Sequence, residues 1–443
     1  LLRGARTAGG SGAAGAGTLN GAWNEALTMT GMTHVETPEF LRDKLDTFGT
    51  PESYPQYSLG WAHAMDTPYQ WTKRIASHWG GSRNGLIVHW PRGITARGET
   101  RHQFHHVIDF APTCLEVAGL PEPQIVNGVT QQPVAGVSMA YSFDAADAPE
   151  RRETQYFEIL GNRGIYHKGW TAVTAHEPPV PDWPQRDFDE DVWELYDTTT
   201  DWTQARDLAA ERPEKLAELQ RLFLIEAAKY DVLPLDDRAA ERADPDSAGR
   251  PLLARGGRQR LYRGIGRLNA FSVINIKNKS HHVTAEIVVP AGGCEGVIAA
   301  QGGLPGGWAL YAKNNRPVYC YNFYGVDRFH VEGTEPLPEG THHLRMEFDY
   351  DGGGVAKGGT VRLLLDDREV GQGRVEHTQP LPFASDEPFE IGRDQGSSVT
   401  SDYTVHEFTG EVNWVEIAIP VGSHDYDTEI TKGERMRAAL VTE

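Results

Sequence analysis

The side chains with the clearest potential for chemistry surround a pair of adjacent glycines, Gly80 and Gly81. Lys73 precedes this pair, and His78 and Arg83 flank it. Ammonium and guanidinium groups bind anions, and the backbone N–H groups of a glycine turn add further donors. An anion site is one interpretation of this pattern. The other is structural, because a lysine within a helix and charged residues beside a turn are usually solvated.

Three histidines, His102, His105 and His106, form a second group whose helical spacing could aim two imidazoles at one ion. We interpret them as an ordinary half-buried helix face. The chain contains no G-x-S-x-G nucleophile elbow, no H-E-x-x-H zinc motif and no P-loop. The residues alone therefore predict no self-contained active site.

The elements that must position these side chains begin with a helix predicted over 68–79, because Thr67-Pro68 is a capping pair and Gly80-Gly81 is a stop signal. An apolar run over 86–90 predicts a buried strand, and a second helix is expected from about 101 to Gly119. Helix, strand and helix in this order favour an α/β layer with a mainly parallel sheet.

The pattern changes after residue 150. Short strands are predicted at 157–159, 164–166 and 193–197, the first two antiparallel. Pro213 then starts a helix whose buried stripe we predict to be Leu216, Leu219, Phe223, Ala227 and Tyr230. This helix is expected to dock on the sheet.

Beyond the charged, turn-rich stretch at 235–256, short apolar strands alternate with Gly, Asp and Asn turns, which is typical of an all-β sandwich. We therefore divide the chain into four parts: a loop or disordered segment (1–22), an α/β part with its C-terminal subdomain (23–243), a linker (244–255) and a β-sandwich (256–443).

The charge of the chain excludes some classes of partner. Its 42 Lys and Arg residues are outnumbered by 62 Asp and Glu residues, which gives a net charge of −20. Sequence-independent binding to nucleic acid, or binding to an anionic membrane, is therefore not expected. No apolar run approaches the roughly 20 residues of a membrane helix, and no signal peptide is present. A cytoplasmic location is favoured, and the oligomeric state is left open.

Several stretches, spread in order over about residues 19–238, resemble the distal part of the catalytic domain of type I, formylglycine-dependent arylsulfatases. They are Ser58–Ala64, Thr67–Tyr69, Lys73–Gly85, Val88–Pro91, His105–Asp109 with Pro112-Thr113, Trp193–Asp197 and Ala205–Ala209. The resemblance implies an alkaline-phosphatase-like α/β fold and hydrolysis of small-molecule sulfate esters. It also implies a bound calcium ion and a sulfate contact at Lys73, with His78 and Arg83 as pocket support.

The chain departs from this family at the nucleophile. No Cys or Ser stands in the C/S-x-P/A-x-R motif from which formylglycine is made, and no carboxylate precedes Glu25 where metal ligands are expected. We identify no metal ligand in the sequence. We expect that roughly the first half of a sulfatase is missing or lies on another chain, so that the fold is incomplete at its N-terminus. The 443 residues alone should lack sulfatase activity.

Residues 256–420 resemble the concanavalin A-like sandwich appended to some bacterial arylsulfatases, with local matches at Asn275–His281 and Gly307–Lys313. Such sandwiches bind glycans or serve only as packing modules. Two alternatives to a sulfatase therefore stay open. One is a phosphomonoester or phosphonate hydrolase of the same superfamily, and the other is a non-catalytic glycan-binding or structural protein.

Overall fold

The computed structural model describes residues 12–17, 19–29, 32–176, 186–237, 254, 256–381, 383 and 387–424. The chain divides into two compact units, which we call the α/β unit and the sandwich unit. The α/β unit comprises Leu59–Asp237 with the residues up to Gly15, and the sandwich unit comprises Ala16–Ser58 with Arg238–Glu443. Residues 23–58, which we had expected in the catalytic part, thus group with the sandwich. Most of the predicted linker lies outside the described residues.

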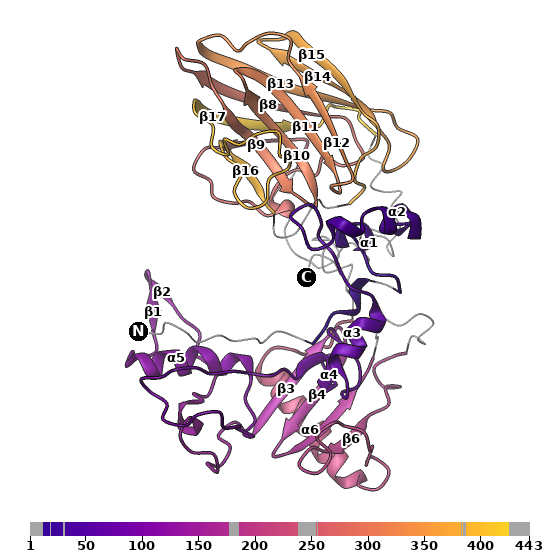
Figure 1. The fold of residues 1–443 in the computed structure, drawn as a ribbon, viewed down its shortest axis with the longest axis vertical. Helices are drawn as coiled ribbons and strands as arrows, with labels where there is room; N and C mark the ends of the chain where they lie inside the picture. Colours follow the sequence, from indigo (N-terminus) through magenta and orange to yellow (C-terminus); the bar gives the residue numbers. More distant parts are fainter. Residues whose placement is uncertain are drawn as a thin grey trace. The chain divides into compact units, whose positions relative to one another are not determined.

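The α/β unit combines helices with a small antiparallel sheet (Figure 1). Its helices are α3 (Leu59–Asp66), α4 (Trp79–Ser82), η4 (Val107–Asp109), α5 (Phe110–Ala118), η5 (Ala140–Ser142) and α6 (Pro213–Lys229). Its strands are β1 (Ile125–Val126), β2 (Val129–Thr130), β3 (Thr154–Ile159), β4 (Asn162–His167), β5 (Trp170–Thr174) and β6 (Glu194–Asp197).

The sheet of this unit has the order β3-β4-β5-β6, and each pair of neighbours is antiparallel. Helix α6 packs on it through Leu219, Phe223 and Ala227, which are buried against residues of β4, β5 and β6. The predicted strands and the docking helix after residue 150 are thus confirmed. Tyr230 is an exception, because it follows the end of α6 and is 38% exposed.

The region before residue 150 differs from the prediction. No ladder between named strands is parallel in the described part of the chain. The apolar run at 86–90 is extended but is in no strand, and the side chain of Ile87 is 70% exposed. A strand needs a neighbour for its backbone groups, and nothing in the described residues pairs with this run. The helix expected from about 101 begins at Phe110, after the short η4.

The sandwich unit contains most of the regular structure (Figure 1). Its helices are η1 (Gly15–Gly17), which spans the unit boundary, α1 (Glu25–Met29), η2 (Thr33–Val35), α2 (Pro38–Asp43), η3 (Leu45–Thr47) and η6 (Ala270–Ser272). Its strands are β7 (Arg258–Tyr262), β8 (His281–Val289), β9 (Gly296–Gly303), β10 (Gly306–Lys313), β11 (Arg316–Phe323), β12 (Asp327–Glu332), β13 (Gly340–Tyr350), β14 (Gly359–Leu365), β15 (Arg368–Val375), β16 (Phe389–Ile391) and β17 (Glu411–Ala418).

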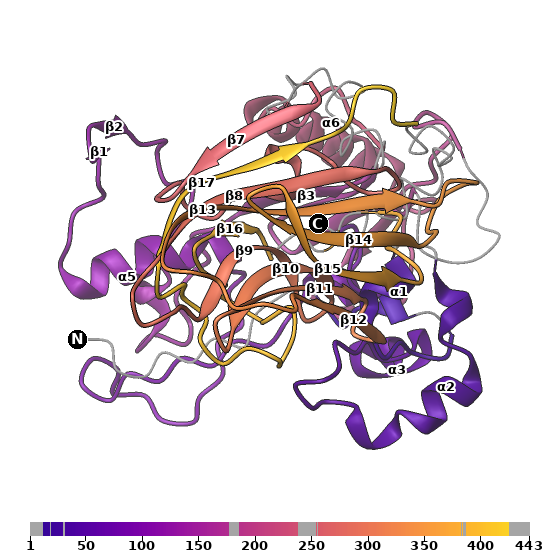
Figure 2. The same cartoon turned by 90° about the horizontal axis from the view of Figure 1, so that it is seen from above.

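Two antiparallel sheets face one another in this unit (Figure 2). Their orders are β12-β11-β10-β9-β16 and β15-β14-β13-β8-β17-β7. Burial alternates strictly along β8, and residues of both sheets, such as Ala285, Leu344, Trp308 and Leu310, meet in one core. The apolar alternation of the sequence therefore predicted the sandwich correctly, since alternate side chains of a strand point to opposite faces.

The N-terminal part of the sandwich unit joins this core. Ala26 and Leu27 are buried within it, and the Asn24 amide donates hydrogen bonds to the carbonyl oxygens of Pro305, at 3.3 Å, and Tyr324. These contacts explain why residues 16–58 group with the sandwich, although the sequence placed most of them in the catalytic part.

The outer face of the five-stranded sheet is also covered. Val399 and Tyr403, from the loop between β16 and β17, pack on side chains that include Ala309 and Tyr311. The Tyr311 hydroxyl donates to Asp402 of the same loop at 2.6 Å. This face is thus filled by the chain itself. In the described parts of both units, no helix is long and apolar enough to cross a bilayer.

Candidate functional site

The candidate site is the loop between α3 and α4, which carries Lys73. The helix predicted over 68–79 is wrong: the chain forms turns from Thr67 to His78, and Trp71 and Arg74 have φ angles of 68° and 84°. Such angles are incompatible with an α-helix. The regular helix lies one segment earlier, at α3, and α4 begins only at Trp79.

The two glycines hold this loop closed. A Cβ atom on Gly80 would lie 2.2 Å from the carbonyl oxygens of Gln70 and Trp71, and one on Gly81 would lie 2.1 Å from that of Ile75. Only glycine permits this close approach of two backbone segments. The Gly80 amide then donates to the Gln70 oxygen at 3.0 Å.

A hydrogen bond holds the backbone of Lys73 in place, whereas its side chain is exposed. Its amide donates to the Ala13 oxygen at 3.0 Å, and the Ala13 amide in turn donates to Asp66 Oδ1 at 2.7 Å. The Lys73 ammonium makes no ion pair within the described residues. The loop thus presents an unneutralised cation on a fixed backbone.

The segment of the sequence that carries this cation has a positive net charge, although the whole chain is strongly acidic. No Asp or Glu occurs between Asp66 and Glu99, whereas this interval contains five cationic residues: Lys73, Arg74, Arg83, Arg92 and Arg97. A local excess of cations attracts anionic ligands even on an acidic protein. This segment is therefore suited to meet an anion.

His78 is fully buried and does not reach the surface. Its Nδ1 lies 2.9 Å from Ser77 Oγ, and its Nε2 lies 3.2 Å from Glu194 Oε2 on β6. Burial alone would raise the pKa of Glu194, but hydrogen bonds from His78 and Tyr196 outweigh it and lower that pKa. His78 therefore connects the loop to the sheet.

Arg83 lies on the surface, at the other end of α4. Its guanidinium carbon is 4.1 Å from the centre of the Trp79 ring and 5.5 Å from that of Tyr69, and Nη1 donates to the Trp202 oxygen at 3.1 Å. Burial against these rings lowers the pKa of Arg83 from its usual value, although a guanidinium stays charged at any physiological pH. The three predicted residues thus have different environments. Lys73 is an exposed cation, His78 is a buried residue that connects the loop to the sheet, and Arg83 is a surface cation stacked on aromatic rings.

The prediction of a helix face at His102, His105 and His106 is wrong, because all three precede η4 and lie in no helix; His105 and His106 have a structural role. The backbone amide of Ile108 donates to His106 Nδ1 at 3.5 Å, and His105 Nδ1 lies 3.8 Å from the carboxylate of Asp109. Asp109 is fully buried and forms an ion pair with Arg152. The nearby His105, the ion pair with Arg152 and hydrogen bonds from the amides of Val137 and His106 overcome the effect of burial and hold the pKa of Asp109 well below its usual range. This ion pair secures the start of α5.

The residues present do not fit a calcium site. Calcium takes six to eight oxygen ligands, largely carboxylates. Across the described ranges, no three His, Cys, Asp or Glu residues are placed to hold a metal ion together. The loop around Lys73 is cationic and repels a divalent cation. The calcium implied by the family resemblance therefore stays a prediction.

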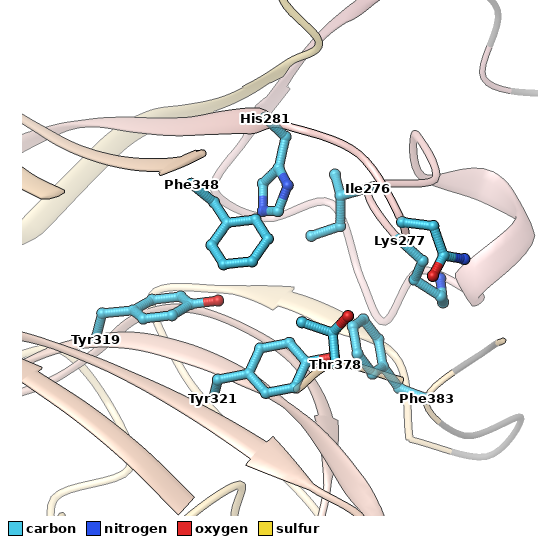
Figure 3. A pocket seen from close by; sticks show the side chains of 9 residues that line it. Ile276, Lys277, His281, Tyr319, Tyr321, Phe348, Thr378 and Phe383 are labelled. Atoms are coloured by element: carbon cyan, nitrogen blue, oxygen red, sulfur yellow. The ribbon is translucent and has the colours of Figure 1, made fainter. Parts of the chain in front are cut away.

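The sandwich unit contains a small internal cavity of about 10 Å³ (Figure 3). Aromatic side chains such as Tyr319, Phe348 and Phe383 line it, together with His281. The volume suffices for about one water molecule. A substrate does not fit there, so the cavity belongs to the packing of the core.

Sequence reasoning missed the residues that support the loop from a distance. Glu194, Tyr196 and Gln204 are between 116 and 134 positions from their partners His78 and Gln70. The hydrophobic periodicity of a sequence does not indicate contacts between residues so far apart in the chain. The acid-free stretch after Asp66 was the one signal in the sequence that could have indicated the local excess of cations.

Two curated proteins are similar to this chain. An uncharacterized sulfatase of Schizosaccharomyces pombe is 26% identical over 227 residues, which are 50% of this chain and 39% of that protein. An arylsulfatase of Klebsiella aerogenes is 28% identical over 141 residues, or 31% of this chain and 29% of that protein. The resemblance to the sulfatase family is thus confirmed. The chain spans about two fifths or less of the length of these relatives.

No protein-family model matches the chain. Among solved structures, a protein from glycosaminoglycan metabolism of Bacteroides thetaiotaomicron is 19% identical, with a TM-score of 0.30 over 40% of this chain and 35% of that one. The CBM40 module of a Ruminococcus gnavus IT-sialidase is 10% identical, with a TM-score of 0.26 over 44% of this chain and 100% of that one.

Proposed function

We propose that the α/β unit contributes a sulfate-binding lysine, Lys73, to the active site of a sulfate ester hydrolase. One observation carries this proposal: Lys73 is an exposed cation without a carboxylate partner in the described chain, on a loop that Gly80 and Gly81 hold closed. It stands at the position where the resemblance to arylsulfatases places a sulfate-binding lysine. The similarity to two curated sulfatases supports the same assignment.

The chemistry of such a site suits an ammonium group. A sulfate ester carries a negative charge, and further charge develops on the bridging oxygen as the sulfur–oxygen bond breaks. A fixed cation stabilises this charge, and removal of one such group commonly costs on the order of 10²–10³ in kcat. His78 contributes indirectly, because its contact with Glu194 fixes the loop on the sheet.

None of these 443 residues stands in the sequence motif from which the formylglycine nucleophile is made. We therefore propose that the residues present bind and orient the sulfate, and that the attacking group is supplied by a part of the enzyme outside this sequence. An alkaline-phosphatase-like arrangement of the complete catalytic domain, with the sandwich as a concanavalin A-like appendage, belongs to this proposal.

The test uses two forms of the protein and 4-nitrophenyl sulfate. The 443-residue chain should show no turnover. The chain extended by the sequence encoded upstream of Leu1 should hydrolyse the ester, and Lys73→Ala should lower its kcat/KM about 100-fold. Lys168→Ala is the matched control, because Lys168 is also exposed but pairs with Glu153 at 3.0 Å. An extended enzyme that loses less than about threefold on Lys73→Ala refutes the role of Lys73.

A further inference from the structure

Four side chains of the α/β unit form a surface group that we call the Arg83 cluster: Tyr69, Trp79, Arg83 and Trp202. Arg83 stacks on Trp79, and the rings of Tyr69 and Trp202 meet edge to face at 5.7 Å. The bond from Arg83 Nη1 to the Trp202 oxygen fixes the guanidinium on the loop that carries Trp202. The cation and the aromatic rings are thus held in one geometry.

The charge of this cluster is not neutralised by the protein. Within the described residues Arg83 has no carboxylate partner, and its Nε and Nη2 groups donate no hydrogen bond. Some other arginines of this unit are paired with carboxylates, such as Arg206, which binds Glu211 at 2.8 Å. A planar guanidinium with one free edge favours bidentate contacts to a carboxylate or sulfate.

Trp202 supplies the second half of a binding surface. Its side chain is 53% exposed, whereas Trp79, beneath Arg83, is buried. An exposed indole on the residue whose backbone oxygen holds the guanidinium can offer two complementary contacts: apolar C–H groups pack on the ring, and an anionic substituent pairs with the guanidinium. A pyranose ring with an acidic group presents both features within a single sugar unit.

We propose that the Arg83 cluster is a binding site for an acidic saccharide, whose ring stacks on Trp202 and whose carboxylate or sulfate pairs with the free edge of Arg83. The site needs neither Lys73 nor hydrolysis, so it goes beyond the function proposed above. A failure of the sulfatase assay leaves the binding measurement valid.

The experiment is calorimetric titration of the full 443-residue chain with three tetrasaccharides of equal length: chondroitin sulfate, unsulfated chondroitin and neutral maltotetraose. Binding of one or both acidic probes, but not of maltotetraose, is the expected result. The comparison of the two acidic probes identifies the anion. Equal binding of all three probes, or binding of none, refutes the proposal.

Variants locate the site. Arg83→Gln should weaken binding about tenfold, as for the loss of a charge-assisted hydrogen-bond pair. Trp202→Ala should weaken it roughly threefold to tenfold. Arg206→Gln and Trp61→Ala are matched controls that should change binding less than twofold. Arg206 is paired with Glu211, and Trp61, which is 68% exposed on α3, has no cation stacked on it among the described residues.

Folding is checked by thermal melting of each variant. If Arg83→Gln alters the melting temperature, Trp202→Ala and Trp202→Phe carry the test, because the exposed ring contributes little to the core. Phe keeps an aromatic face, so it should retain more affinity than Ala. Unchanged affinity in Trp202→Ala, or an equal loss in the two control variants, contradicts the assignment.

Discussion

His281 shows how one buried side chain can couple the stability of the sandwich to pH. Its Nδ1 donates to the Lys279 oxygen at 3.0 Å, whereas Nε2 has no hydrogen-bond partner and faces the aromatic cavity (Figure 3). Burial lowers the pKa of His281 to about 4; the hydrogen bond to the Lys279 oxygen opposes this shift, and the charges of Lys277 and Lys279 reinforce it. The native sandwich therefore requires a neutral imidazole.

The resulting stability should fall with acidification. In the unfolded chain His281 binds a proton near pH 6.5, but in the folded chain only near pH 4. The full stability is present above pH 6.5, and about 3 kcal/mol is lost as the pH falls from 6.5 to 4. Urea unfolding of the full chain at several pH values measures this slope. His281→Asn, which keeps a donor for Lys279, should have a flatter slope between the same limits, and equal slopes would contradict the explanation.

The residues of the candidate site were predictable to different degrees. Lys73 was located through the family resemblance, since a lysine with no ion-pair partner is not distinguishable from a solvated one by sequence periodicity. For His78 the sequence left a structural role and pocket support open, and the structure buries it against Glu194, a residue 116 positions away. Contacts of such sequence separation depend on tertiary packing, which local patterns do not encode.

At the scale of elements, the two helices that flank the candidate loop differ in their need for glycine: α4 requires Gly80, whereas α3 does not require Gly60. Gly80→Ala should destabilise the α/β unit, because the added methyl group would collide with two carbonyl oxygens at 2.2 Å. Gly60→Ala in α3 is the matched control, since nothing lies within 4 Å of its added Cβ. That variant should gain up to about 1 kcal/mol from the better helix propensity of alanine. Thermal melting distinguishes the two, and a tolerated Gly80→Ala would show that the closed loop is dispensable.

Elements were predicted correctly where the hydrophobic pattern of a segment is matched by packing partners in the same chain. The sandwich strands and α6 carry clear periods of 2 and 3.6, and their partners lie in the same chain. The run at 86–90 has the composition of a buried strand but no partner in the described chain, so it stays exposed. The helix expected at 68–79 failed because capping signals describe only the ends of a segment, whereas Trp71 and Arg74 take left-handed angles within it.

At the scale of the whole molecule, the α/β unit exposes many large apolar side chains. Large side chains with at least a third of their area exposed include Trp61, Leu86, Ile87, Val107, Leu120, Ile125 and Leu224. Adjacent exposed apolar residues, such as Leu86, Ile87 and Val88, mark an interaction face or promote aggregation when they form a contiguous patch. Such a unit is consistent with a catalytic domain that other segments normally cover.

The purified chain should therefore bind a hydrophobic dye such as ANS and should self-associate at higher concentration. Ile87→Asp should reduce the dye fluorescence, because it places a charge in the middle of the exposed run. Val421→Asp is the control, since Val421 is fully exposed in the sandwich unit outside any described cluster. A monomeric chain that melts cooperatively and binds no dye contradicts this account.

The measurement that tests the central claim most directly is the ratio of kcat/KM for 4-nitrophenyl sulfate to that for 4-nitrophenyl phosphate, determined on the chain extended by its upstream coding sequence. A sulfate ester hydrolase should favour the sulfate, and the Lys73→Ala variant should lose most of that activity. A clear preference for the phosphate would instead identify a phosphoester hydrolase of the same superfamily, and it would contradict the function proposed for Lys73.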